Sequence, residues 1–227
     1  MAYQFDFSFV REYTPQFISG AVQTAQLSLL ATVLGFALGT VCAVGSTSRS
    51  AWARGTAAAY VEIIRNTPML VQLFLVYFGL ATLGLKLSAT TSAVAGLVIN
   101  IGAYSTEIIR AGIESVRRGE LEAADCLGLS RWQVLRHIVL PPAIERVYPA
   151  LTSQYVLLML GTSTASQISA EELTAVSSRI QSDTFRSFEV FLVAAVLYLL
   201  LSFAMRGLFW ALGRWVFTRR RLLGTPL

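Results

Sequence analysis

The sequence predicts an all-α membrane protein with five transmembrane helices. Its 227 residues are 55% apolar and only 14% charged, and the mean hydropathy is +0.60, which makes the chain more apolar than soluble domains of this size. The apolar residues gather into five runs, and each run is long enough to cross a bilayer core as a helix, which needs roughly 20 residues. Because short connections join the runs, we expect residues 1–227 to form a single transmembrane domain.

The five predicted spans follow these apolar runs. Only helices and closed barrels satisfy every backbone polar group within lipid, and the length of each run favours a helix. Pro68 interrupts the second run. It has no N–H and frees the carbonyl of Ile64, which predicts a kink or a new helix start near Asn66 and Thr67. The predicted spans cover residues 22–44, 57–80, 92–113, 148–168 and 188–212.

Basic residues are distributed unevenly between the two sets of connecting segments. One set carries Arg49, Arg54, Arg117, Arg118, Arg131, Arg136, Arg146, Arg214 and residues 219–221. The other set carries only Arg11, Lys86, Arg179 and Arg186. The positive-inside rule assigns the Arg-rich set to the cytoplasm, so we expect the N-terminus outside the cell and the C-terminus in the cytoplasm.

The net charge of +5 is split among these short segments, which favours contact with anionic lipid headgroups over nucleic-acid binding. Residues 1–20 lack a basic leader followed by an apolar core, so no removable signal peptide is expected. Cys42, Cys126 and His137 are too few and too widely spaced to predict a metal site.

Ionisable side chains inside a span are costly, so each is expected to be paired or functional. Glu62 and Arg65 lie three residues apart in the second span, and we expect them to pair with each other. Glu107, Arg110 and Glu114 predict a salt-bridged stripe at the cytoplasmic end of the third span. Purely structural pairing is the alternative interpretation of both sets.

The fourth span ends in a hydroxyl-rich stretch, GTSTASQ, which contains Thr162, Ser163, Thr164 and Gln167. Hydroxyls in a helix can bond their own backbone, so one interpretation is inert packing. The other interpretation is a polar lining for a pathway through the membrane.

A polar segment, residues 115–146, separates the third and fourth spans and contains EAADCLGLSRWQVLRHIVLPPA. The residues around Glu122 favour helix, and Gly128 suits the left-handed conformation that ends one. Ser130 and Gln133 have the spacing of a capping box, which predicts a second short helix over residues 131–138. Pro141 and Pro142 are expected to end that helix.

The same segment has a face of low relief, because Ala123, Ala124 and Gly128 carry small side chains or none. Such a face allows the backbone of another protein to approach closely, which predicts a docking surface. An ordinary amphipathic loop is the alternative.

The segment resembles the EAA loop of the membrane subunits of bacterial ABC importers in the order and spacing of Glu122, Ala123, Ala124, Gly128, Ile138, Leu140 and Pro141. The resemblance implies a type I ABC importer permease fold with a cytoplasmic coupling-helix loop, seated in a groove of a separate ATPase. The positions expected to couple to the ATPase are Glu122, Ala123, Ala124, Gly128, Ile138 and Pro141.

Two further segments resemble the polar amino acid subgroup of these permeases. They are EIIRNTPMLVQLFLVYFGL, residues 62–80, and GAYSTEIIRAGIESVRRGELEAA, residues 102–124. The resemblance implies an amino acid as cargo. From it and from the polar positions above, the residues expected along the substrate pathway are Glu62, Arg65, Tyr104, Glu107, Thr162, Ser163, Thr164 and Gln167.

The hydroxyl-rich stretch departs from the family's usual Lys-Asp-Thr-Ser-Leu form. Leu160 and Gly161 stand where Lys and Asp are expected, and Ser153 stands where Asn is usual. The departure removes a carboxylate that a buried cationic amino acid would require. We therefore expect a neutral polar or acidic cargo rather than a cationic one.

The resemblance also implies the partners. The chain has no GxxxxGK[ST] sequence, so we expect no catalytic residue and no bound cofactor or metal, with ATP and Mg used by a separate ABC ATPase dimer. A second, identical or related permease subunit and a periplasmic amino-acid-binding protein are expected, in the bacterial inner membrane. The alternatives are an intramembrane Ser/His enzyme that uses His137, and a stand-alone secondary carrier or channel.

Overall fold

The computed structural model describes residues 5–217, and within that range the protein contains helices and no strands. Residues 219–221, expected to contact lipid headgroups, lie outside the described range. The helical elements, in chain order, are α1 (Phe9–Ser46), α2 (Ala51–Arg65), α3 (Met69–Phe74), η1 (Leu75–Gly79), α4 (Leu80–Thr82), α5 (Ala89–Glu114), α6 (Arg118–Cys126), α7 (Arg131–Gln133), η2 (Val134–Val139), α8 (Leu140–Gly161), η3 (Thr162–Ile168), α9 (Leu173–Thr184) and α10 (Ser187–Val216).

Three of the described helices, α1, α5 and α10, are long and apolar enough to cross a membrane. The second predicted span is broken, because α2 and the segment from Met69 to Thr82 meet at an angle of 108° and together make a fourth candidate. The fourth predicted span, 148–168, falls on α8 and η3, which are not among the candidate membrane-spanning helices. The number of five spans therefore stays a prediction.

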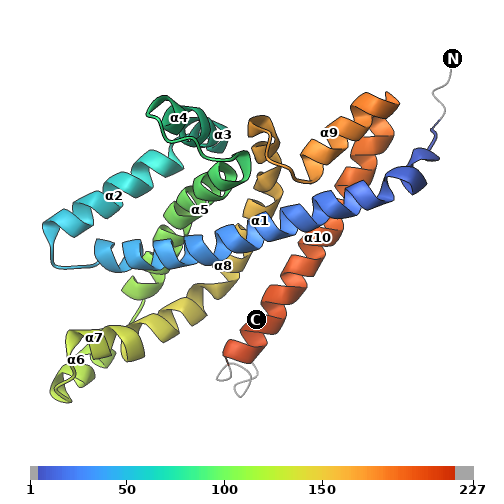
Figure 1. Ribbon diagram of the computed structural model, residues 1–227. Coiled ribbons are helices and arrows are strands. Elements are labelled where there is room, and N and C mark those ends of the chain that lie inside the picture. The colour runs from blue at the N-terminus through green and yellow to red at the C-terminus, as the bar shows by residue number, and fades with distance from the viewer. Residues whose placement is uncertain (1–4, 218–227) are drawn as a thin grey trace.

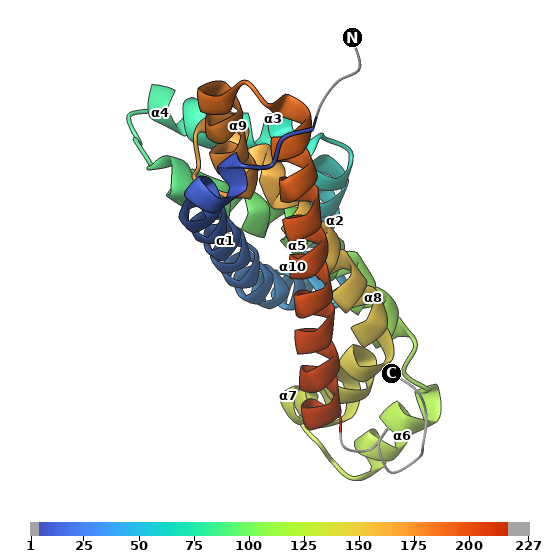
Figure 2. The same ribbon diagram turned by 90° about the vertical axis from the view of Figure 1, so that its right-hand side faces the viewer.

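The long helices cross at the centre of the molecule (Figures 1 and 2). Helix α1 runs obliquely over α5 and α8, and α10 lies beside α8. α6 and α7 project from one end, whereas α3, α4 and α9 lie at the opposite end. The main apolar core forms at the crossing, with Ala31, Leu97, Ile101, Leu151 and Met159 almost fully buried.

Glycines allow α1 and α5 to approach closely. A Cβ atom added to Gly39 would lie 2.5 Å from the Ser105 Cβ and 2.9 Å from the Gly102 carbonyl oxygen. A Cβ atom on Gly35 would collide with the side chain of Ile101. The two backbones are therefore too close to admit a side chain at Gly39, whereas at Gly35 the Ile101 side chain already fills the space.

This contact predicts a large difference between two glycine substitutions. Gly39→Val is expected to lower the melting temperature of the detergent-solubilised protein, because overpacking typically costs about 1–3 kcal/mol. Gly207→Val is the matched control, since nothing lies within 4 Å of its added Cβ in the middle of α10. Equal melting temperatures for the two variants would contradict the close packing of α1 against α5.

Helix α1 begins well before the first predicted span. Its first turns pack Phe9 and Phe17 against α9 and α10, which explains the longer helix. Arg186, at the start of α10, forms a salt bridge with Asp6 and donates to the Asp6 carbonyl oxygen at 2.7 Å. The hydrogen bond from the Ser8 backbone N–H, assisted by Arg186, lowers the pKa of Asp6 to about 2. The ion pair therefore persists well below physiological pH, and it holds the chain before α1 against the start of α10.

Candidate functional site

The turn between α6 and α7 has the local structure that its sequence predicts. Gly128 adopts a left-handed conformation with φ of +67°. The Leu129 N–H donates to the Ala124 carbonyl and the Gly128 N–H to the Asp125 carbonyl, and these two bonds form a Schellman motif. Ser130 caps α7, and the capping box with Gln133 is complete. The geometry of the helix–turn–helix is therefore confirmed.

The expected end of the second helix at Pro141 and Pro142 is wrong. Both prolines occupy the first turn of α8, where a missing N–H is tolerated, and the helix continues to Gly161. The preceding turn, η2, is π-helical, and its wider hydrogen-bonding pattern accommodates the two prolines without ending the helix. The chain from Arg131 to Gly161 is thus one uninterrupted helical path, and η3 follows directly.

The predicted coupling residues differ in their exposure. Glu122, Ala123 and Pro141 are exposed, Ile138 is half-buried, and Ala124 is only 2% exposed because it packs inside the turn. Ala124 therefore supports the surface from beneath and is not itself part of it.

Two apolar side chains beside the predicted coupling residues are also strongly exposed. They are Leu127, which is 77% exposed, and Trp132, which is 65% exposed, and neither was among the residues predicted from the sequence. They flank the Gly128 turn. An exposed aromatic residue at the projecting end of a polar segment is itself a signal for protein contact. We define the docking turn as Glu122, Ala123, Leu127, Gly128 and Trp132.

The break in the second span is confirmed where Pro68 predicts it, since α2 ends at Arg65 and α3 begins at Met69. The Ile64 carbonyl that Pro68 leaves without its helical partner accepts a hydrogen bond of 2.7 Å from the Gln72 Nε2. The Gln72 Oε1 in turn accepts from the Asn100 Nδ2 at 2.9 Å, in a buried contact. The Gln72 amide therefore satisfies the carbonyl that Pro68 leaves free, and its bond to Asn100 holds the broken segment against α5.

The expected pair between Glu62 and Arg65 is wrong. The Glu62 carboxylate accepts from the Asn66 Nδ2 at 2.9 Å. Arg65, at the last turn of α2, reaches across to α5 instead, where its guanidinium lies 3.8 Å from Glu107 and 5.4 Å from the centre of the Tyr104 ring. On α5, Arg65 contacts both a carboxylate, Glu107, and an aromatic ring, Tyr104. This combination is more favourable for the guanidinium than the single carboxylate of Glu62 on α2.

This arrangement creates an open polar cavity of about 240 Å³ at the end of α2. Glu62, Arg65, Asn66 and Tyr104 line it, together with Val61. We refer to it as the Arg65 cavity. It brings together a carboxylate, a guanidinium, an amide and a phenol, which can bind groups of either charge.

The stripe on α5 is confirmed. The Arg110 guanidinium donates to both carboxylate oxygens of Glu107, at 3.0 and 2.9 Å, and to Glu114 at 2.6 Å. Glu107 therefore joins Arg65 and the Arg65 cavity to the C-terminal end of α5.

The hydroxyl-rich stretch forms η3, a 3₁₀ helix, and lies apart from the Arg65 cavity. Thr162, Ser163 and Thr164 each donate to a carbonyl three residues earlier, at 2.7 to 2.9 Å. Their protons are therefore used within the helix, as the packing interpretation expects, while the oxygens keep accepting capacity. Gln167 is exposed and forms only a long contact, 3.4 Å, with Ser166.

His137 lies on η2 in the polar segment, exposed, with its Nδ1 atom 3.1 Å from the Gln133 carbonyl oxygen. An intramembrane catalytic pair requires a base that faces a serine at membrane depth. The position of His137 does not meet that requirement.

Comparison with known proteins decides the class. Residues 35–218 match the family described as the inner membrane component of binding-protein-dependent transport systems. The chain belongs to this family. As a permease of that family it is a transport subunit and not an enzyme.

Two curated relatives match along nearly their whole length. The glutamine transport system permease protein GlnP of Escherichia coli (strain K12) is 36% identical over 211 residues, covering 90% of this permease and 96% of the relative. The octopine transport system permease protein OccM of Rhizobium radiobacter is 34% identical over 221 residues, covering 92% and 90%.

Solved structures show the same fold. The crystal structure of an amino acid ABC transporter with histidines contains a chain that is 36% identical, with a TM-score of 0.84, covering 93% of this permease and 99% of that chain. The MetNI methionine ABC transporter has a chain with a TM-score of 0.77 at 18% identity, which supports the fold alone. The type I ABC importer permease fold is thereby confirmed.

Proposed function

We propose that this permease imports a neutral polar or acidic amino acid, delivered by a periplasmic binding protein and driven by a separate ABC ATPase dimer. The observation that carries the proposal is the docking turn, a rigid and exposed helix–turn–helix at one end of the molecule (Figure 1). A stand-alone carrier or channel would have no use for it. A second permease copy, identical or related, completes the pathway in the bacterial inner membrane.

The choice of cargo is supported by the charges of the polar sites. An amino acid carries a carboxylate and an ammonium group, and the Arg65 cavity offers Arg65 to the first and Glu62 to the second. Beyond that pair, η3 has no carboxylate that could replace the hydration of a cationic side chain. The similarity to a glutamine permease agrees with a neutral polar cargo.

Uptake by the reconstituted complex tests this proposal. Proteoliposomes that contain the permease, its ATPase and its binding protein are expected to accumulate glutamine or glutamate in preference to arginine. Arg65→Gln is expected to reduce uptake roughly tenfold or more, since a charge-assisted hydrogen bond contributes about 1.5–3 kcal/mol. Arg11→Gln, an exposed arginine at the start of α1, is the control. Strong arginine uptake without glutamine or glutamate uptake would refute the choice of cargo.

A natural cysteine of the chain, Cys126, allows the proposed orientation in the membrane to be tested. Cys126 is exposed at the end of α6, whereas Cys42 is half-buried within α1. A membrane-impermeant maleimide is expected to label Cys126 in inside-out vesicles and not in intact spheroplasts. Cys126→Ser, which should remove the signal, is the control. Labelling in spheroplasts would place the docking turn outside the cell and contradict the orientation.

A further inference from the structure

A groove of about 320 Å³ separates α8 from α10 in the halves of these helices that approach the docking-turn end of the molecule. It is independent of the Arg65 cavity and of the docking turn. Its lining includes Tyr148, Thr152 and Ser153 from α8 and Arg206, Phe209 and Trp210 from α10.

Close contact between the two helices holds one end of the groove rigid. The Tyr148 hydroxyl donates to the Phe209 carbonyl at 2.6 Å. A Cβ atom added to Gly213 would lie 2.7 Å from the Tyr148 ring, so the α10 backbone rests directly on this ring. The groove is therefore a fixed feature of the α8–α10 contact.

The α10 wall of the groove is basic and aromatic. Arg206 and Trp210 line the groove, and Arg214 continues their ridge one turn beyond it, because the three residues are spaced four apart along the helix. The Arg214 guanidinium lies 4.7 Å from the centre of the Trp210 ring. Within residues 5–217, no carboxylate forms a salt bridge with either arginine, and no acidic side chain lines the groove.

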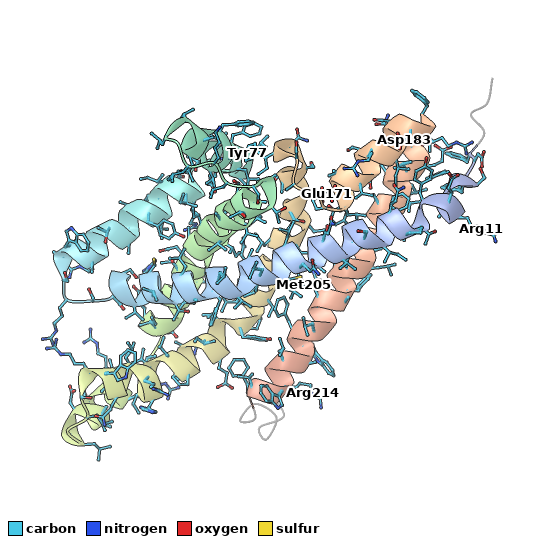
Figure 3. The ribbon with its side chains drawn as sticks, viewed as in Figure 1. Arg11, Tyr77, Glu171, Asp183, Met205 and Arg214 are labelled. Atoms are coloured by element: carbon cyan, nitrogen blue, oxygen red, sulfur yellow. The ribbon has the colours of Figure 1, made fainter. Side chains whose placement is uncertain are left out.

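The surroundings of Arg206 are apolar. On the preceding turns of α10, Leu199, Leu200 and Phe203 are 54%, 57% and 62% exposed, as on a helix that faces lipid chains. Arg206 precedes the end of α10 at Val216 by roughly 15 Å of helix. An arginine at that depth is costly unless its charge is paired or reaches the interface, and its long side chain can extend toward the nearer membrane surface, where lipid phosphates lie. Figure 3 shows Arg214 at that same end, far from Arg11 and Asp183.

We propose that this groove binds the phosphodiester headgroup of an anionic phospholipid from the cytoplasmic leaflet. Arg206 and Arg214 supply guanidinium groups that can bind phosphate oxygens, and Ser153, which is exposed, can donate from its hydroxyl. Trp210 lies between the arginines, where the indole ring suits the membrane interface. The inference uses the proposed orientation but assigns a ligand that the transport cycle does not require.

Native mass spectrometry of the purified permease tests the site without ATP, ATPase or amino acid, so its result is independent of the proposed transport function. Phosphatidylglycerol is expected to remain bound, whereas phosphatidylcholine is lost. The double variant Arg206→Gln/Arg214→Gln is expected to bind phosphatidylglycerol about thirtyfold more weakly, from about two basic contacts at the membrane surface. Arg49→Gln/Arg54→Gln removes the same charge elsewhere and should leave binding unchanged.

Three outcomes would overturn the proposal. Equal retention of the two lipids would exclude selection by the headgroup. Equal weakening by the control pair would indicate diffuse charge attraction, with no site in the groove. Displacement of the lipid by millimolar inorganic phosphate, or a cysteine crosslink between Thr152→Cys on one copy and Leu208→Cys on another, would assign the groove to a soluble anion or to a second permease copy.

Discussion

Gly128→Asp in the docking turn is expected to abolish ATP-driven uptake while leaving the permease folded. Nothing lies within 4 Å of a Cβ atom added at Gly128, so the new side chain fits the isolated chain and projects from its surface. Asp tolerates the left-handed conformation better than most residues, and the cost to stability is about 1 kcal/mol. A charged side chain at the centre of a contact with the ATPase, however, typically costs 2 kcal/mol or more, or roughly thirtyfold in affinity.

The measurement is ATP hydrolysis and uptake in proteoliposomes, together with co-purification of the ATPase. Glu122→Lys, which reverses a charge on the exposed face of α6, should give the same loss. Gly55→Asp is the control, because this glycine is also exposed and unobstructed but lies on α2, away from the turn. Normal transport by both Gly128→Asp and Glu122→Lys would show that the docking turn does not bind the ATPase.

Gln72→Leu is expected to destabilise the permease strongly and to reduce uptake with it. Leucine fills a similar volume, but it leaves the buried Asn100 amide without its 2.9 Å bond. It also removes the 2.7 Å bond to the Ile64 carbonyl, which then keeps only the longer contacts of 3.3 and 3.4 Å with Thr67. A buried polar group left without a partner costs about 1–3 kcal/mol, so thermal unfolding in detergent should show a clear decrease in the melting temperature.

A double-mutant cycle separates the two halves of this network. Asn100→Leu removes only the bond to α5 and should cost less than Gln72→Leu. The double variant should be no less stable than Gln72→Leu alone, because the Asn100 amide is no longer buried without a partner. Gln26→Leu, at an exposed site on α1, controls for the loss of an amide. Additive losses in the cycle would show that the two side chains do not act through each other.

Local rules predicted the parts of this structure that depend on neighbours in sequence. The turn at Gly128, the cap at Ser130 and the break at Pro68 each follow from a backbone preference of one residue and its near neighbours. Charge distribution along the chain gave an orientation by a separate route.

The two errors have different physical causes. Sequence spacing pairs Arg65 with Glu62 on the same helix, but the distant residues Tyr104 and Glu107 on α5 form the better site. For Pro141 and Pro142 the cause is local, because proline stops a helix from its interior but is tolerated in the first turn of one.

Helix α9 and the Gln72 network show what remained hidden. α9 is amphipathic and short, and its N-cap is Glu172, a residue type that seldom fills that role. The Glu172 carboxylate accepts from the backbone of Thr174 and Ala175 and from the Tyr198 hydroxyl, a set that only the folded chain brings together. For Gln72 a signal was present: the free carbonyl created by Pro68 requires a donor, and Gln72 is a nearby amide.

The continuous helical path between Arg131 and Gly161 has a mechanical consequence. It follows roughly 45 Å of chain from beside the docking turn to the base of η3, with the π-helical turn η2 and Pro149 as its two internal irregularities. A displacement of the docking turn is then expected to travel along this path as movement of whole helical segments, with any change of direction concentrated at η2 and Pro149. The break at Pro68 is held to α5 by Gln72 and Asn100, so it is not expected to take up that movement.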